Sequence, residues 1–156
     1  MNSIWKYLTI GGVSRDELLE RLVDSGHSVN DYARDIISKK EFTTREDLTT
    51  LKLAKVQVSE LGFTNKPTSA ELFSRTKQRK LGLCPAETGL HLRLAYPDQP
   101  LDEWIWVAME TIVDSNGNPN MFDVVRTTRG SWIRGRWVSP EGFWRLDEII
   151  VFVCLD

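Results

Sequence analysis

The chain has 156 residues, of which 41% are hydrophobic and 27% are charged, and its formal net charge is −2. A chain of this size and composition can bury a core without disulfides or a structural metal, and it lacks the low hydrophobicity and high net charge of a disordered protein. The charge balance excludes a binder that holds nucleic acid through an overall basic excess, so such a function would need a local patch.

The N-terminal residues carry no targeting signal that we can identify. Met1 to Lys6 lacks a basic region followed by an apolar core, and no stretch approaches the roughly 20 apolar residues of a membrane span. We therefore expect a cytoplasmic protein with no membrane partner.

The first half of the sequence is predicted to be largely helical. Ser14 and Glu17 form a capping-box pattern, which is followed by apolar residues at helical spacing and by Gly26 at a C-cap position. A second helix is expected from Ser28, with Val29, Tyr32, Ala33, Ile36 and Ile37 on its buried face. Residues 14–38 are thus predicted to form a helical hairpin.

The middle of the chain gives mixed signals. Residues 51–58 fit either a strand or a helical face, and Val56 and Val58 favour the strand. A third helix is expected after Pro67, because Thr68 to Glu71 is typical of a helix start. Residues 85–96 suit a short helix opened by Pro85, although a strand is also possible. The end of the third helix carries four cations: Arg75, Lys77, Arg79 and Lys80.

The last third of the sequence reads as strands separated by turns. Four are expected, within residues 103–112, 121–126, 131–138 and 149–155, and their regular spacing favours an antiparallel meander. Helices followed by strands, without alternation, predict an α+β fold. In this prediction, N-terminal helices (about residues 1–96) pack on a C-terminal antiparallel sheet of about four strands (about residues 103–156), within a single domain over residues 1–156.

Several stretches in the centre of the chain resemble a group of short, uncharacterised bacterial proteins. The resemblance covers roughly residues 53–126. The stretches that carry it are Leu61-Gly62-Phe63, Leu83-Cys84-Pro85-Ala86-Glu87-Thr88-Gly89, Leu92-Arg93-Leu94, Asp98-Gln99-Pro100, Glu103-Trp104, Ala108-Met109-Glu110, Asp114-Ser115 and Gly117-Asn118-Pro119. The resemblance implies a free-standing bacterial domain, and it implies no activity, cofactor or partner.

Two constellations could support catalysis. Cys84 and His91 would share one helical face, with Glu87 or Glu110 to orient the imidazole. Alternatively, carboxylates among Glu87, Glu110 and Asp123 could face one cleft and hydrolyse a glycosidic bond. The simpler interpretation is a buried inert thiol, a surface imidazole, a helix-capping Glu87, and solvent-facing Glu110 and Asp123.

The sequence predicts no cofactor and no metal. No glycine-rich phosphate loop follows a strand. Asp114, Asn116 and Asn118 have the oxygen spacing of a calcium loop but lack its downstream glutamate, so we expect a plain turn there.

Tryptophan beside arginine is the most unusual feature of the sequence. Strand alternation puts Trp132, Arg134 and Arg136 on one face, with Ile133, Gly135 and Trp137 on the other. Trp104 and Trp106 also share a face of their strand. A surface of indoles and guanidinium groups suits a protein interface or single-stranded nucleic acid, and it also suits a structural face on which arginine stems cover the rings.

From these residues we expect a non-catalytic protein-interaction module whose binding residues are Trp104, Trp106, Trp132, Arg134 and Arg136. The first alternative is a nucleic-acid-associated protein that also uses the basic patch of Arg75, Lys77, Arg79 and Lys80. The second is a small hydrolase that uses carboxylates or the Cys–His pair. In the preferred interpretation Arg134 and Arg136 are exposed, so folding should not depend on them.

Overall fold

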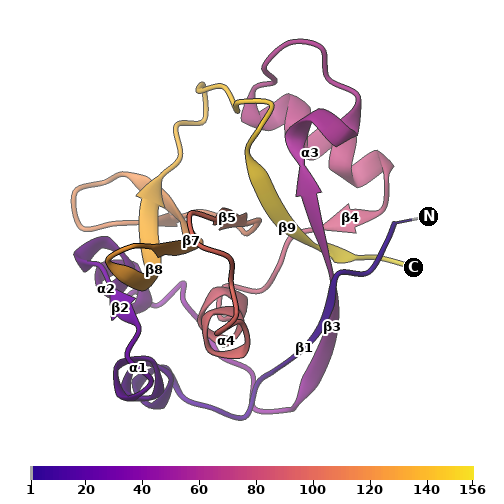
Figure 1. Ribbon diagram of the computed structural model, residues 1–156. Helices are drawn as coiled ribbons and strands as arrows, with labels where there is room; N and C mark the ends of the chain where they lie inside the picture. Colours follow the sequence, from indigo (N-terminus) through magenta and orange to yellow (C-terminus); the bar gives the residue numbers. More distant parts are fainter. Residues whose placement is uncertain (1) are drawn as a thin grey trace.

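A computed structural model describes residues 2–156 of the chain, which form four α-helices, one 3₁₀ helix and nine strands (Figure 1). The helices are α1 (Arg15–Asp24), α2 (Asp31–Ile37), η1 (Val58–Leu61), α3 (Ser69–Gln78) and α4 (Thr88–Ala95). The strands are β1 (Lys6–Ile10), β2 (Ser28–Val29), β3 (Thr49–Gln57), β4 (Leu81–Gly82), β5 (Trp104–Val107), β6 (Ile112–Val113), β7 (Pro119–Thr127), β8 (Gly130–Trp137) and β9 (Ile149–Cys154).

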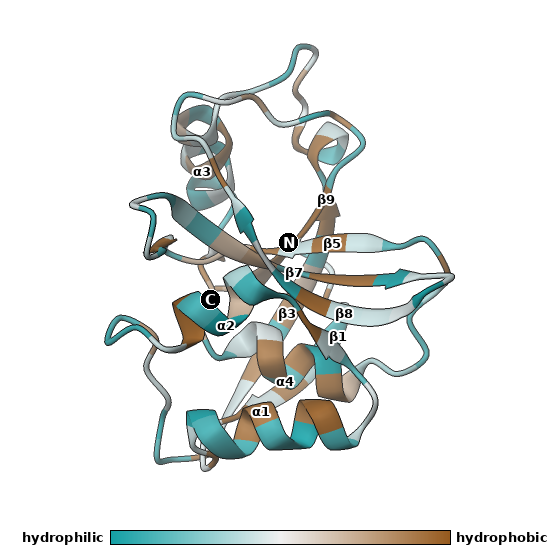
Figure 2. Cartoon of the chain, turned by 90° about the vertical axis from the view of Figure 1, so that its left-hand side faces the viewer, coloured by the Kyte–Doolittle hydropathy of each residue, from teal (hydrophilic) through white to brown (hydrophobic). Residues whose placement is uncertain are grey.

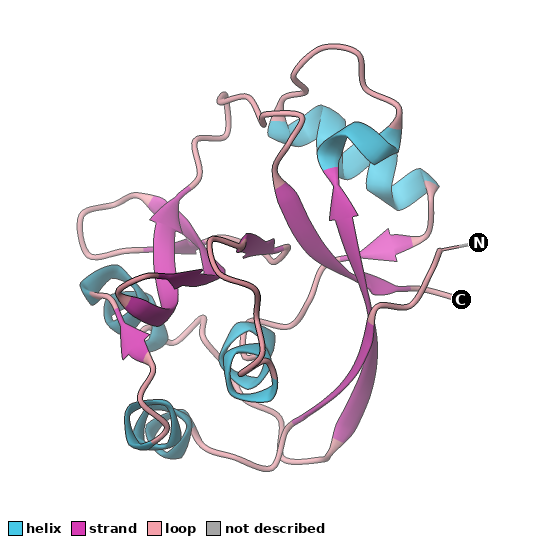
Figure 3. Cartoon of the chain, in the orientation of Figure 1, coloured by secondary structure: helices cyan, strands magenta, loops and turns pink. Residues whose placement is uncertain are grey.

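All nine strands belong to one mixed sheet. The main path runs β1-β3-β9-β5-β7-β8-β2, while β4 pairs with β9 and β6 pairs with β7. Two of the pairings are parallel, β5 with β9 and β2 with β8. The sheet curls, and α4 lies inside the curve (Figures 1 and 3).

The predicted fold class is therefore wrong: the protein is a sheet-dominated mixed α/β fold. The half that was expected to be helical supplies four of the nine strands described for residues 2–156. The last strand is not the end of a meander, because β9 lies between β3 and β5. β1 went unnoticed although it alternates, with Leu8 and Ile10 buried and Tyr7 and Thr9 exposed.

The helical hairpin was predicted only in part. Ser14 caps α1 as expected, its hydroxyl accepting the Glu17 backbone N–H at 3.2 Å. The second helix begins later, because Ser28 and Val29 pair with β8 as a short parallel strand. Asn30 is the actual N-cap of α2, and its side chain accepts the Ala33 N–H at 2.8 Å.

Two other local predictions are confirmed. Residues 51–57 are a strand within β3. Thr68 caps α3 in a full capping box with Glu71, in which each side chain bonds to the backbone N–H of the other residue. The predicted short helix also exists, and it begins at Thr88.

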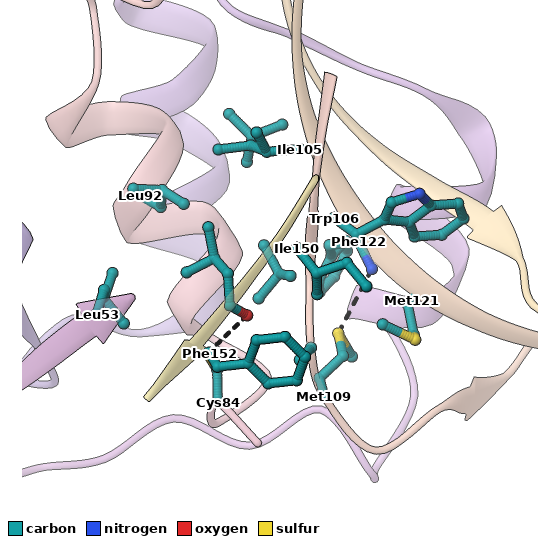
Figure 4. Close-up of a cluster of buried hydrophobic side chains, with 14 of the residues drawn as sticks. Leu53, Cys84, Leu92, Ile105, Trp106, Met109, Met121, Phe122, Ile150 and Phe152 are labelled. Atoms are coloured by element: carbon teal, nitrogen blue, oxygen red, sulfur yellow. Dashed lines mark hydrogen bonds between the residues drawn. The ribbon is translucent and has the colours of Figure 1, made fainter. Parts of the chain in front are cut away.

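The hydrophobic core lies between α4 and the curled sheet. Figure 2 shows hydrophobic segments on α1 and α4, and the close-up in Figure 4 shows Leu92 of α4 near Ile105 and Ile150 of two central strands. All three are buried. α3 packs against β9 through the rings of Phe73 and Phe152, whose centroids are 6.4 Å apart.

A buried arginine ties α4 to the strands around it. Arg93 has no exposed surface, and burial lowers its pKa to about 10. Its guanidinium donates to the Gln99 side chain at 2.6 Å and to the carbonyl oxygens of Tyr96 and Val125 at 2.7 and 3.1 Å. These bonds replace the water that a buried cation loses, and they fix α4 beneath β7.

None of the helices within residues 2–156 is long and apolar enough to cross a membrane.

Candidate binding surface on strands β5, β7 and β8

The five residues that the sequence singled out lie together on one sheet face, called here the Trp/Arg face: Trp104, Trp106, Trp132, Arg134 and Arg136. Strand register brings them together, because Trp106 is opposite Asp123 and Asp123 is opposite Arg134. One row further along, Val125 separates Trp104 from Trp132. Ile133 and Gly135 are buried, as expected for the opposite face.

A buried aspartate holds both arginines in place. Asp123 is 1% exposed; its carboxylate accepts two hydrogen bonds from Arg134, at 3.0 and 2.8 Å, and one from Arg136 at 3.2 Å. The expectation that Asp123 faces solvent is therefore wrong. Its negative charge is balanced by two partly exposed guanidinium groups. The same hydrogen bonds restrict the rotamers of the two arginine side chains.

Each guanidinium also stacks on an indole. The Arg134 guanidinium carbon lies 4.6 Å from the ring centroid of Trp104, and that of Arg136 lies 4.6 Å from that of Trp106. Trp104 is 45% exposed, whereas Trp106 is 7% exposed and donates its indole N–H to Glu148 at 3.1 Å. Trp104 is thus available to a partner, and Trp106 mainly supports the face from below.

Three cavities lie along β8. A cavity of about 180 Å³ is lined by Trp132 and Arg134, and one of about 470 Å³ is lined by Trp104, Trp106 and Arg136. A third, of about 390 Å³, lies where Arg136 meets Trp137 and Tyr32 of α2. Trp137 is 64% exposed. The Trp/Arg face is therefore a hollowed surface rather than a flat sheet.

The charge along this surface is mixed. Besides Arg136, the lining of the 470 Å³ cavity contains four carboxylates and a second arginine: Asp102, Glu103, Asp147, Glu148 and Arg145. Two of these acids already have basic partners, since Glu103 pairs with Lys55 at 2.9 Å and Asp147 with Arg145 at 3.1 Å. Both signs of charge thus line one cavity.

The basic patch lies elsewhere, on α3, which is separated from β8 in both Figure 1 and Figure 2. Arg75 donates to the carbonyl oxygen of Leu61, and Arg79 donates to those of Glu60 and Leu61 at 3.1 Å. These arginines therefore bind the carbonyl end of η1, while Lys77 and Lys80 are exposed.

Cys84 is unsuited to nucleophilic chemistry. Its thiol is buried and donates to the carbonyl oxygen of Val151 at 3.7 Å (Figure 4). Burial raises its pKa to about 12, so almost no thiolate exists at neutral pH.

Glu87 and Glu110 line a different cavity, of about 530 Å³, whose lining also includes Cys84 but not His91. Glu87 is fully buried and does not cap α4, contrary to expectation, and burial raises its pKa. Its Oε1 lies 3.5 Å from Nε2 of His91, whose pKa is lowered by burial. Glu110 is exposed, as expected.

The calcium-like segment is a turn closed by Asp114. Its carboxylate accepts the backbone N–H groups of Asn116 and Asn118 at 2.9 Å and the side-chain amide of Asn120 at 2.8 Å. These bonds lower the pKa of Asp114. Within residues 2–156, no group of three or more His, Cys, Asp or Glu side chains is placed to hold a metal ion.

Sequence reasoning missed Tyr32 and Trp137 as surface residues. Tyr32 was assigned to the buried helix face, yet it is 50% exposed, because α2 starts at Asp31 and turns this residue outward. Trp137 was assigned to the face opposite the arginines. It is 64% exposed there, and no local pattern signals that exposure.

Comparisons with protein-family models, with curated proteins and with solved structures found no match to this chain.

Proposed function

We propose that this chain is a non-catalytic interaction module that binds a protein partner through the Trp/Arg face. The observation that carries this proposal is the pair of cavities on this face, each lined by an arginine and at least one tryptophan. Tryptophan and arginine are the residues most enriched among binding hot spots, and shallow cavities between them accept partner side chains.

The arrangement of the arginines supports binding rather than simple coverage of the rings. Asp123 and the indoles hold Arg134 and Arg136 in fixed positions, so little side-chain entropy is left to lose when a partner docks. Trp104 remains 45% exposed despite the stacked guanidinium.

The charges favour a protein partner over nucleic acid. Asp102, Asp147 and neighbouring carboxylates line the same cavity as Arg136, and they would repel a phosphate backbone. The basic patch on α3 does not extend the surface, because it lies elsewhere and two of its arginines bind η1. A protein surface can present both signs of charge in register.

The test is affinity capture with variants that remove exposed rings and leave the Asp123 ion pairs intact. We expect Trp104→Ala and Trp132→Ala to lose the partner, each by about tenfold or more in retained amount. Tyr7→Ala is the matched control, because Tyr7 is 63% exposed on β1, outside the face. Melting curves should be close to that of the wild type for all three variants.

The proposal would be contradicted if Tyr7→Ala also lost the captured partner, or if both tryptophan variants still retained it. A single-stranded oligonucleotide is titrated in parallel at low salt. Binding that falls steeply with salt and needs Trp104 would favour the nucleic-acid alternative instead.

One observation favours a second candidate, a small acid–base hydrolase. Glu87, with its raised pKa, and the exposed Glu110 line one 530 Å³ cavity, which is the combination that general acid catalysis with a second carboxylate requires. Chromogenic glycosides test it. Turnover that disappears in both Glu87→Gln and Glu110→Gln, but persists in Glu46→Gln, would support a hydrolase. If the wild-type protein turns over none of the glycosides, the hydrolase candidate is excluded.

A further inference from the structure

The cavity at the end of β8 has two exposed aromatic walls. Tyr32 and Trp137 are 50% and 64% exposed, and both line the space of about 390 Å³. Asn30, Asn118, Gly135 and Arg136 complete its lining. No carboxylate lines it, in contrast to its 470 Å³ neighbour.

The walls are held rigidly. The Asn30 side chain accepts the Gly135 N–H at 2.9 Å and donates to the Gly135 carbonyl oxygen at 3.2 Å, and it also caps α2. Gly135 permits this closeness, since a Cβ there would lie 2.8 Å from the Ala33 nitrogen. The N-terminus of α2, and Tyr32 with it, is thus fixed against β8.

Three side chains that line the cavity keep hydrogen-bonding groups for a ligand. The hydroxyl of Tyr32, the indole N–H of Trp137 and the side-chain amide of Asn118 make no hydrogen bond within residues 2–156. The Arg136 guanidinium is turned away from them, because it binds Asp123 and stacks on Trp106 on the opposite face of the sheet from Gly135 and Trp137. The cavity therefore offers uncharged hydrogen-bonding groups beside its two rings.

The backbone of Trp137 faces an open edge of the sheet. β2 pairs with β8 only at Trp132 and Ile133, and the Asn30 side chain takes the place of a strand at Gly135. Along an edge strand, alternate residues direct both N–H and C=O to the same side. Trp137, two residues after Gly135, therefore directs its N–H and C=O to that side, beyond the last strand of the described sheet.

We infer that this cavity receives an aromatic side chain of the partner, carried by an extended peptide segment that pairs with β8. The inference deepens the proposed function and rests on it. The ring lies against Tyr32 and Trp137, and the peptide backbone pairs with the free N–H and C=O of Trp137. A peptide supplies the ring and the amide groups together, whereas a nucleotide has no backbone amide for this edge.

The probe is N-acetyl-L-phenylalanine, which carries a ring and an amide. In a ¹H–¹⁵N NMR titration we expect saturable shifts of the Gly135 backbone amide and the Asn118 side-chain amide, with a Kd of about a millimolar, as suits a ligand of this size. N-acetyl-L-phenylalaninamide should bind with a similar Kd, because the recognition comes from the ring and the amide groups and not from a charge. N-acetyl-L-alanine should cause no shift.

Matched variants locate the binding. Trp137→Ala should abolish the shifts and Tyr32→Ala should weaken them, while Tyr7→Ala, on β1, should leave the Kd unchanged. All three rings are exposed, so the variants should remain folded. Shifts that persist in Trp137→Ala, equal binding of the alanine probe, or tighter binding of adenosine monophosphate than of the phenylalanine probe would overturn the inference.

Failure here is distinguishable from failure of the proposed function. If partner capture needs Trp104 and Trp132 but not Trp137, and the probe does not bind, the face binds protein without using this cavity. If no captured protein depends on Trp104 or Trp132, the proposed function itself falls, whatever the probe does.

Discussion

Asp123 determines how much stability is lost when the neighbouring arginines are replaced. Strand alternation alone suggested that Arg134 and Arg136 are free on the surface, so that folding would not depend on them. In the structure they are the partners of a carboxylate that is 1% exposed. The same two side chains therefore serve both the proposed binding surface and the stability of the sheet.

We predict that Arg134→Ala combined with Arg136→Ala lowers the free energy of unfolding by about 3 kcal/mol or more, because a buried carboxylate is left unpaired. Asp123→Asn should cost about 1 kcal/mol, since the two arginines it leaves behind are partly exposed and regain water. Urea unfolding of the two variants measures the difference. Equal costs would mean that Asp123 does not depend on its partners.

His27 gives the fold a defined response to acid. Its Nδ1 lies 2.6 Å from the Ser131 hydroxyl, and burial, with a smaller contribution from Arg93, lowers its pKa. The unfolded chain therefore binds a proton at this residue more readily than the folded chain does. The contribution of neutral His27 to the free energy of unfolding is fully present above about pH 6.5, the unfolded-state pKa. It is lost as the pH falls toward the lowered folded-state pKa.

We expect wild-type stability to fall between pH 7.5 and 5.5 more steeply than that of His27→Gln, in which no imidazole titrates at this position. Urea unfolding at several pH values provides the comparison. His91→Gln serves as a second reference, because it removes the other histidine and leaves His27 in place. If the wild-type and His27→Gln slopes are parallel, burial does not depress the pKa of His27.

At the scale of helices and strands, the elements with local signals are the ones that sequence reasoning identified. The caps at Ser14 and Thr68 are side-chain bonds to backbone three residues away, so they can be read without knowing the fold. β2 depends on pairing with Trp132, more than 100 residues further along, and no local pattern announces it. Asp123 was misassigned for the same reason, because its partners lie on the next strand.

Gly135 is where a helix and a strand approach most closely. Glycine is needed in this strand for packing, since a Cβ at this position would lie 2.8 Å from the Ala33 nitrogen. We predict that Gly135→Ala costs about 1–3 kcal/mol, because the new methyl group must push α2 away from β8. It should also weaken binding of N-acetyl-L-phenylalanine, since Tyr32 moves with α2.

Gly142→Ala is the control for loss of glycine flexibility, because its Cβ would meet only Ser139, at 3.2 Å from that side chain's Cβ and 3.4 Å from its carbonyl oxygen. Thermal melts of both variants, together with the probe titration, complete the comparison. A Gly135→Ala protein as stable as Gly142→Ala would show that α2 can shift without cost.

At the scale of the whole molecule, the two halves of the chain share one sheet. Residues 97–102 resemble a linker in composition, yet β3 from the first half pairs with β9 from the second, and β9 pairs in turn with β5. The local patterns identified most of these strands, but their order depends on contacts between distant segments, which composition does not encode.

We therefore predict that fragments 1–96 and 103–156, produced separately, do not fold. Each would leave the hydrophobic faces and edges of its strands without partners. One-dimensional NMR should show poorly dispersed amide signals for each fragment, and a mixture of the two should recover part of the dispersion of the intact chain. A well-dispersed spectrum from fragment 103–156 alone would contradict this.

The position of β9 also affects how the chain reaches its structure. Its neighbours β3 and β5 are both made earlier, and neither can acquire its inner partner until residues 149–154 are available. Closing such distant contacts slows folding, into the range of milliseconds to seconds for sheets of high contact order. While residues 108–148 are being synthesised, the nascent chain thus carries two unpaired strand edges, on β3 and β5, and these are the sites at which a chaperone, or a second nascent chain, would first attach.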